Sequence, residues 1–367
     1  MKKKKINIGI LFGGKSAEHE VSLQSAKNII DAIDKEKYNP ILIGIDKSGK
    51  WLLNDRTNFL LDTDNPKLIK INQSNDNVAL IPQNEGKISN LTRADSSESV
   101  DVVFPVLHGP FGEDGTIQGL LKLANIPFVG AGVLGSAIGM DKEIMKRLLR
   151  DAKLPIGAFI AIKPEDELPG FEAISKKIGV PFFVKPANLG SSIGISKVND
   201  KAGYKLAVRE AFNYDSKILI EEYIKGREIE CSVLGNSDPI ASIPGEIIST
   251  HEFYSYEAKY IDEKGATLEI PAKLTEEVTR RVQDLAIATF KTLSCEGLGR
   301  VDFFLRNDDE IIVNEINTIP GFTSISMYPR LWEATGIPYS ELIDRLIQLA
   351  FDRFEKEQRM KTSHETG

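Results

Sequence analysis

The chain has 367 residues, which is enough for two or three domains with a large hydrophobic core. Its 41% hydrophobic and 27% charged residues describe a globular protein, and a net charge of -7 argues against general nucleic-acid binding. No apolar stretch approaches the ~20 residues of a membrane helix. Two cysteines, Cys231 and Cys295, give no disulfide framework, so a cytoplasmic enzyme is the expectation.

The first part of the chain alternates strand-like and helix-like segments. Residues 6–12, 40–45 and 100–107 are apolar runs typical of buried strands. Apolar residues from Leu23 to Ile33 recur at spacings of three and four, which predicts a helix. This alternation predicts a parallel α/β domain over residues 1–140, with the polar stretch from about 54 to 99 as a decorated surface region.

The remainder predicts two further domains and a short tail. A helix around residues 141–151 begins a central domain over 141–235. A third domain covers 236–360 and ends in a helical pattern. The polar end, 361–367, is predicted to be a disordered tail.

Residues 9–16 match the P-loop pattern G-x-x-x-x-G-K-[ST] letter for letter. A P-loop needs its middle residues to wrap a phosphate with free backbone N–H groups. Here Ile10, Leu11 and Phe12 continue the strand that starts at Ile6. Too few residues remain to form a phosphate cradle, so we interpret the motif as a strand end.

Residues 184–196 form a better candidate phosphate loop between two strand-like runs. Gly190 and Gly194 allow a tight turn, and the N–H groups of Ser191 and Ser192 can point at an anion. Lys185 adds a positive charge at the strand end. The alternative is a flexible serine-glycine hairpin that binds nothing.

Residues 218–233 contain an apolar strand that ends in acids, a glycine turn and a second strand. The backbone of such a turn can contact an adenine edge, and Glu228 could accept hydrogen bonds from ribose hydroxyls. The alternative is that these acids are simply solvated.

Two alternating runs, residues 299–305 and 311–318, predict a two-stranded ribbon. If Asp308 and Asp309 form a two-residue loop, antiparallel pairing places Asp302 opposite Glu315 and Arg300 opposite Asn317. Facing carboxylates repel unless a cation lies between them, and oxygen ligands suit Mg²⁺. The alternative is an exposed hairpin with solvated charges.

Taken in order, the strand lysine, the Ser/Gly loop, the E-E-Y-I hinge and the R-x-D…N-E-I-N ribbon resemble the ATP-grasp family. Residues 13–22, 104–115, 256–260 and 314–326 further resemble the motifs of D-alanine–D-alanine ligases. The matches extend from about residue 7 to 350.

The resemblance implies a three-domain ATP-grasp architecture of the α/β class with α+β elements. It implies that ATP phosphorylates one D-alanine, that the amine of a second attacks the acyl phosphate, and that D-alanyl-D-alanine forms for peptidoglycan synthesis. Two Mg²⁺ or Mn²⁺ ions and a homodimer are also implied, with D-alanine and ATP as the binding partners and neither nucleic acid nor membrane.

The resemblance also implies roles for matching positions. Catalysis would involve Glu18, Ser191, Tyr260, Arg300 and the Gly321 N–H. The two D-alanines would contact His108, Ser326 and the Met327 backbone. ATP would be bound by Lys142, Lys185, Ser191, Ser192, Glu221, Glu222, Tyr223, Ile224, Glu228 and Lys259. The metal ligands would be Asp302, Glu315 and Asn317. Without the family, Glu18 would be a carboxylate complementing a helix N-terminus and His108 a structural histidine.

Two positions bear on specificity. Tyr260 is kept in residues 257–260, where relatives that make D-alanyl-D-lactate replace it, so dipeptide formation is favoured. Glu222 stands where many relatives carry lysine, which puts a base contact from that side chain in doubt. The alternatives are a D-alanine–D-lactate ligase, another ATP-grasp carboxylate–amine ligase, and a non-catalytic nucleotide-binding regulator.

Overall fold

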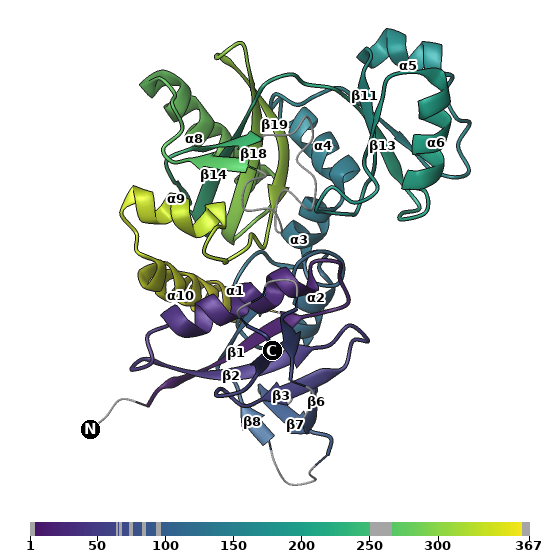
Figure 1. The fold of residues 1–367 in the computed structure, drawn as a ribbon. Helices are drawn as coiled ribbons and strands as arrows, with labels where there is room; N and C mark the ends of the chain where they lie inside the picture. The colour runs from purple at the N-terminus through teal and green to yellow at the C-terminus, as the bar shows by residue number, and fades with distance from the viewer. Residues whose placement is uncertain are drawn as a thin grey trace, which may run out of the picture.

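The computed structural model describes residues 4–63, 65, 68–72, 76–82, 86–92, 97–249 and 266–361. They form three sheet-centred parts (Figure 1). The N-terminal sheet lies at the bottom of the view, and the central and third sheets lie side by side above it.

The N-terminal sheet has seven strands in the order β8-β7-β6-β3-β2-β1-β9. Its parallel part, at one end of that order, consists of β1 (Ile6–Gly13), β2 (Tyr38–Ile45) and β9 (Val102–Val106). The antiparallel strands are β3 (Trp51–Asn54), β6 (Asp76–Leu80), β7 (Lys87–Asn90) and β8 (Ser97–Ser99). A separate pair is formed by β4 (Leu60–Leu61) and β5 (Lys70–Ile71).

The expectation of a parallel sheet is therefore right only for β1, β2 and β9. Residues 54–99, expected to be surface decoration, instead supply strands that extend the sheet by antiparallel pairing. Antiparallel strands need only short connections, so a polar stretch with short strands can join an existing sheet edge. Strand β1 continues through Gly13, which confirms that residues 9–16 are a strand end and not a P-loop.

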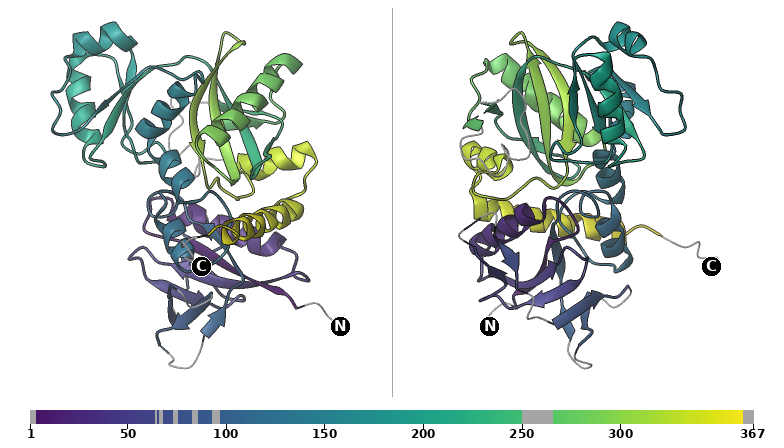
Figure 2. Two further views of the ribbon diagram at one scale, coloured as in Figure 1. Left: turned by 180° about the vertical axis from the view of Figure 1, so that it is seen from behind. Right: turned by 45° about the vertical axis from the view of Figure 1, so that its right-hand side comes forward.

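Helices from both ends of the chain cover the N-terminal sheet. They include α1 (His19–Ala32), α2 (Thr116–Leu123) and the C-terminal α10 (Tyr339–Gln358). Helix α3 (Val133–Met140) instead contacts α2 and the third sheet. Helix α10 lies beside α1 and above the sheet (Figures 1 and 2). Leu342 and Leu346 of α10 pack in one core with Phe12 and Phe104 of the sheet. The C-terminal helix thus completes the N-terminal core.

The central part has an antiparallel sheet in the order β10-β13-β11-β12. Its strands are β10 (Phe159–Ile162), β13 (Ile218–Glu222), β11 (Phe182–Pro186) and β12 (Ser196–Val198). Helices α5 (Phe171–Ile178) and α6 (Lys201–Ala211) bury Ile174 and Tyr204 against the sheet. The opposite face is left to line the cavity described below.

The third sheet has the order β17-β16-β14-β18-β19, with β15 paired to β14. Its strands are β14 (Arg227–Gly235), β15 (Ile240–Ala241), β16 (Gly245–Ser249), β17 (Ala266–Glu269), β18 (Gly297–Arg306) and β19 (Glu310–Asn317). The nearby helices are α4 (Lys142–Asp151), α8 (Glu276–Thr292) and α9 (Met327–Thr335). Strand β14, within the expected range 141–235, pairs with β18 along its whole length. The domain boundaries themselves stay a prediction.

The ribbon of β18 and β19 has the expected pairing but not the expected loop. Asp302 lies opposite Glu315 and Arg300 opposite Asn317. Arg306 pairs with Glu310, so the loop has residues 307–309 and the two-residue loop is wrong. A bulge beside Asp302 takes up the extra residue, Asn314, and restores the predicted register.

The described part of the chain contains no helix that is both long enough and apolar enough to cross a membrane. Both cysteines, Cys231 and Cys295, are buried free thiols. Burial raises the pKa of each thiol to about 12, so neither is a reactive thiolate at neutral pH.

Arg353 of α10 provides a test of how this helix is held. Its guanidinium donates to the carbonyls of Gly130 and, at 2.7 Å, Phe128, and lies 4.3 Å from the Phe128 ring centre. We expect Arg353→Met to lower the free energy of unfolding by about 2–4 kcal/mol, because buried carbonyls lose charged donors. Urea unfolding measures this. Arg345→Met, which removes an exposed pair with Glu341 on the same helix, should cost at most about 0.5 kcal/mol. Equal losses in the two variants would contradict the prediction.

Candidate active site

A cavity of about 510 Å³ lies between the central and third sheets. Its volume is within the range of small-molecule and cofactor sites. The central sheet and its turn contribute Phe183, Lys185 and residues 221–224, and the third sheet contributes Phe304 and residues 313–315. The residues expected to bind ATP that line it are Lys142, Lys185, Ser191, Ser192, Glu221, Glu222, Tyr223, Ile224 and Glu228. Lys259, also expected there, lies outside the described residues.

Three lysines line this cavity, and two glutamates balance part of their positive charge. Lys185 Nζ lies 2.6 Å from Glu221 Oε2, and Lys146 Nζ lies 3.4 Å from Glu221 Oε1. Lys142 Nζ lies 3.5 Å from Glu315 Oε2 and donates to the Leu189 carbonyl at 2.9 Å. Such a cluster of cations in a cavity suits an anionic ligand.

The pKa shifts follow from burial and from these pairs. Burial lowers the pKa of Lys146, and attraction to Glu221 only partly opposes it. Burial also acts to lower the pKa of Lys185, but Glu221 and Glu315 outweigh it and the pKa is raised. Burial acts to raise the pKa of Glu221, but Lys146 and Lys185 outweigh it and the pKa is lowered. The Lys185–Glu221 pair is therefore charged.

Lys146 was not among the residues predicted from the sequence. It lies four positions after Lys142 on helix α4, so the two side chains share one face of the helix. That spacing was the available signal. Its partner, Glu221, comes from the central sheet, and no local pattern predicts that contact.

The loop between β11 and β12 has an unusual backbone. Ser191 and Ser192 both have positive φ, at 53° and 60°, which costs about 1–3 kcal/mol per non-glycine residue. Gly194 has φ of 70°, and a Cβ there would meet Pro186 at 2.9 Å. Strain concentrated in a loop that lines a cavity supports a binding role for that loop.

The expected metal ligands lie on the ribbon, and each of the two acids among them is paired with a basic side chain. Arg300 donates from Nε and Nη2 to the two oxygens of Asp302, at 2.7 Å each, and Nε also lies 2.9 Å from Glu230. Glu315 has Lys142 as its partner. Arg300 was expected to take part in catalysis, a role that the contacts within the chain do not test. In this structure it is an ion-pair partner of Asp302.

The donor set fits a hard divalent cation. No group of three His, Cys, Asp or Glu side chains that could hold a metal occurs in the described part of the chain. Asp302 and Glu315 are cross-strand neighbours, and Asn317 shares a strand face with Glu315. Two carboxylates and an amide oxygen leave coordination positions for phosphate oxygens, as Mg²⁺ sites do.

Glu18 connects the N-terminal part to the phosphate loop. It occupies the N-cap position of α1, yet its side chain does not cap that helix. Its carboxylate instead accepts a hydrogen bond from the Ser191 hydroxyl. Tyr260, the third member of the expected closing group, lies outside the described residues.

His108 and Glu113 both contact the backbone of Ile319, just after the ribbon. His108 Nδ1 lies 2.9 Å from the Ile319 carbonyl, and its Nε2 has no partner among the described residues. Burial lowers the pKa of His108, which favours the neutral ring. Glu113, which was not predicted, accepts from Gly109 N at 2.6 Å and Ile319 N at 3.3 Å. Only its place beside the predicted His108 motif hinted at a role.

The loop after the ribbon is compact around Gly321. A Cβ on Gly321 would lie 2.7 Å from Ser326 Oγ, so a side chain there would clash. Ser326 Oγ accepts a hydrogen bond from the Thr323 N–H at 3.0 Å, and it forms a 2.8 Å hydrogen bond with the Thr323 hydroxyl. Met327 begins helix α9 immediately after Ser326. Helix N-termini attract carboxylates, so this loop is suited to an anionic group.

Family models match most of the chain: "D-ala D-ala ligase N-terminus" matches residues 7–131 and "D-ala D-ala ligase C-terminus" residues 148–348. The D-alanine–D-alanine ligase of Oceanobacillus iheyensis is 56% identical over 371 residues, which cover 100% of both chains. The solved D-alanine–D-alanine ligase of Coxiella burnetii has a TM-score of 0.85 at 40% identity and covers 97% of this chain and 96% of its own. That of Bacillus anthracis complexed with ATP has a TM-score of 0.72 at 29% identity, covering 96% and 99%.

Glu113 yields a prediction about pH and stability. Burial and the nearby Glu18 raise the pKa of Glu113 to about 8. Part of the residue is accessible to solvent, but protein surrounds its carboxyl group, which is the part that titrates. An unfolded carboxyl loses its proton near pH 4.5, so the folded chain binds the extra proton between that pH and about 8. The free energy of unfolding contributed by this group therefore falls as pH rises through that window.

Glu113→Gln removes this titrating group. The melting temperature of the variant, relative to that of the unchanged protein, should therefore rise as pH increases from 5 to 8. Thermal unfolding across this range measures the difference. Glu341→Gln, which changes an exposed carboxylate on α10, should show no such slope. Parallel profiles for Glu113→Gln and the unchanged protein would contradict the assignment.

Proposed function

The chain belongs to the D-alanine–D-alanine ligase family and catalyses the ATP-dependent ligation of two D-alanines, and on this premise we propose which of its residues carry each step. The observation that carries the proposal is one cavity lined by a phosphate-type loop, by three lysines and by Glu315, which lies opposite Asp302 on the ribbon. Phosphoryl transfer depends mainly on positioning and charge neutralisation, and this arrangement supplies both.

ATP binds between the two sheets. The phosphates lie against Lys142, Lys185 and the N–H groups of the loop that carries Ser191 and Ser192, which all line the cavity. The base lies against the backbone of residues 221–224, and Glu228 accepts from the ribose hydroxyls. Apolar side chains from both sheets, Phe183 and Phe304 among them, enclose the base.

Two Mg²⁺ or Mn²⁺ ions would be held by Asp302, Glu315 and Asn317. When bound, they would neutralise phosphate oxygens during transfer. Lys142 contacts Glu315 in this structure, so the same carboxylate lies within reach of both the lysine and the expected metal position. This placement supports a shared phosphate and metal site.

The first D-alanine binds where the N-terminal part meets the phosphate loop. The Glu18 carboxylate accepts a hydrogen bond from the ammonium group of this D-alanine. The carboxylate of the D-alanine attacks the terminal phosphorus of ATP, which gives an acyl phosphate and ADP. The neutral ring of His108 lines this subsite. The contact between Glu18 and Ser191 supports the placement because it joins substrate and phosphate sites.

The second D-alanine binds at the start of α9, where Ser326 and the Met327 N–H hold its carboxylate. Its amine attacks the acyl carbon, and the tetrahedral intermediate expels phosphate. Arg300 and the Gly321 N–H stabilise the oxyanion. Asp302 and Glu230 hold the Arg300 guanidinium in place, and a preoriented cation costs little reorganisation when charge develops.

Residues outside the described part of the chain complete the proposal. Tyr260 would act with Glu18 and Ser191 in closing the site, and Lys259 would act on a phosphate oxygen; both roles rest on the family resemblance. Closure would keep water from the acyl phosphate, which otherwise hydrolyses. A homodimer and a cytoplasmic location complete the proposal and rest on the family; light scattering tests the dimer.

Arg300→Met tests the oxyanion role. We expect kcat to fall about a hundredfold or more, since loss of one oxyanion donor typically costs roughly 2.7–4 kcal/mol. Steady-state phosphate release measures this. Arg306→Met, on the same strand, removes an exposed pair with Glu310 and should leave kcat unchanged. Near-normal turnover of Arg300→Met would exclude this role.

The second-substrate specificity is tested with ATP and D-alanine, with D-lactate offered as the competing acceptor. Because Tyr260 is retained, we expect the ester product at neutral pH to form at least about tenfold more slowly than the dipeptide. Product analysis by mass spectrometry separates the two. Comparable rates would favour the D-alanine–D-lactate alternative, and phosphate release that ignores D-alanine would favour another ligase. Asp302→Asn serves as the inactive control.

A further inference from the structure

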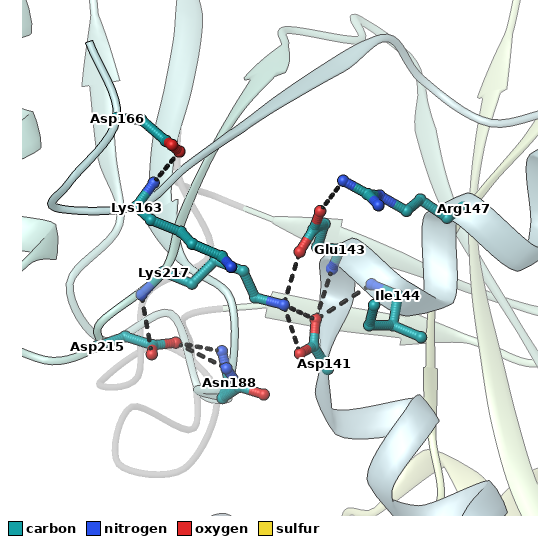
Figure 3. A network of polar contacts seen from close by, with 9 residues as sticks. All are labelled: Asp141, Glu143, Ile144, Arg147, Lys163, Asp166, Asn188, Asp215 and Lys217. Carbon is teal, nitrogen blue, oxygen red and sulfur yellow. Dashed lines mark hydrogen bonds and ion pairs between the residues drawn. The ribbon is translucent and has the colours of Figure 1, made fainter. Parts of the chain in front are cut away.

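Lys217 lies at the base of the phosphate loop, outside the set of residues assigned above. It precedes strand β13, and its side chain is only 13% exposed. Its Nζ lies 2.8 and 2.6 Å from the two oxygens of Asp141 and 2.7 Å from Glu143 Oε2 (Figure 3). One ammonium group thus binds two carboxylates at the start of helix α4.

Asp141 connects this ammonium group to Lys142. Its Oδ1 accepts hydrogen bonds from Glu143 N and Ile144 N at 3.1 Å each, so it caps helix α4. Lys142 is the first residue of that helix. Its backbone N–H donates to the Ala187 carbonyl at 3.0 Å, and its Nζ donates to Leu189. Lys142 is therefore attached to the phosphate loop at both its backbone and its side chain.

The backbone around Lys217 is hydrogen-bonded to the first residues of the phosphate loop. The Lys217 carbonyl accepts from Ala187 N at 3.0 Å, and the Lys217 N–H donates to Asp215 Oδ1 at 3.2 Å. Asp215 Oδ2 accepts from Asn188 N at 2.7 Å and from its side-chain amide at 3.0 Å (Figure 3). The first residues of the loop are therefore fixed to residues 215–217, and the Lys217 side chain extends from there to the start of α4.

We propose that Lys217 is a positioning residue for nucleotide binding: by tying the start of helix α4 to the base of the phosphate loop, it holds Lys142 and the loop as one phosphate-binding unit. The proposal rests on the proposed role of Lys142 in binding ATP. It predicts a defect specific to the nucleotide, because no D-alanine contact proposed above passes through Lys217.

Charge supports the same conclusion. Asp141 and Glu143 place two carboxylates beside the residue that is to meet phosphate, and both contact Lys217. Burial acts to lower the pKa of Lys217, but the hydrogen bonds to Asp141 and Glu143 outweigh it and raise the pKa, so the group stays charged. Arg147, whose side chain is largely exposed, contacts Glu143, and Figure 3 draws no contact between Arg147 and Asp141. Loss of Lys217 would leave Asp141 without its ammonium partner near an incoming triphosphate.

The central experiment measures KM for ATP and for D-alanine in Lys217→Met. We expect KM for ATP to rise about tenfold or more, since small misplacements of a binding group have effects of this size, while KM for D-alanine stays within about twofold. Lys217→Arg, which keeps the charge, should recover part of the loss. Lys201→Met is the matched control: it removes an exposed lysine paired with Glu172 in the same part of the chain and should change neither constant.

A double variant tests whether Lys217 acts through Lys142. In the Lys142→Met background, adding Lys217→Met should raise KM for ATP much less than it does alone, because the group being positioned is gone. Independent, multiplying effects would overturn the proposal. So would a lower melting temperature of Lys217→Met with an unchanged KM for ATP, which is what a purely structural lysine gives.

Two further measurements keep the outcomes distinct. If Lys217→Met does not fold, Lys217→Gln, which keeps an uncharged amide donor group for the acids, should still raise KM for ATP, and an unchanged value would overturn the proposal. If Lys142→Met itself leaves KM for ATP unchanged, the proposed ATP site is wrong and the positioning role falls with it. A normal Lys217→Met beside a defective Lys142→Met overturns only the positioning role.

Discussion

Keeping three lysine side chains buried in one cavity is the physical constraint on which the rest of the site depends. Isolated ammonium groups are costly to bury, and three together also repel. The chain meets the constraint with Glu221, which contacts both Lys146 and Lys185, and with Glu315, which contacts Lys142. These carboxylates come from different sheets, so the compensation of two of the three charges exists only when both sheets are in place. A bound triphosphate would enter a site whose cations are already oriented, which lowers the cost of reorganisation.

The same dependence extends to the N-terminal part. Ile319, just beyond the ribbon, contacts His108 through its carbonyl and Glu113 through its N–H. Phe322 N donates to Ser25 of helix α1 at 3.0 Å. Helix α10 then returns the chain to the N-terminal sheet and completes its core. The segment that follows the proposed metal ligands is therefore anchored to the part that supplies Glu18, and the geometry of substrate binding is coupled to the packing of the core.

Local patterns in the sequence predicted those features that depend on short-range alternation. The strand end at Gly13, the loop carrying Ser191 and the pairing of Asp302 with Glu315 were of this kind. The parallel sheet was predicted too broadly, because short polar strands that join by antiparallel pairing carry little periodic signal. Lys146, Glu113 and Lys217 were missed because their partners lie far away in sequence, and burial of a charged side chain cannot be inferred without knowing its partner.

The bulge at Asn314 has a consequence for how this enzyme tolerates change. Asp302 and Glu315 face each other because of the total number of residues between them. Some of these residues form the turn, one forms the bulge, and the rest pair in the ladder. A two-residue turn with a regular ladder and a three-residue turn with one bulge give the same pairing. The turn at the solvent end of the hairpin can therefore change its type without turning the acidic pair, provided that a bulge in the ladder takes up or releases the same residue. The bulge acts as a length compensator between the turn and the acidic pair.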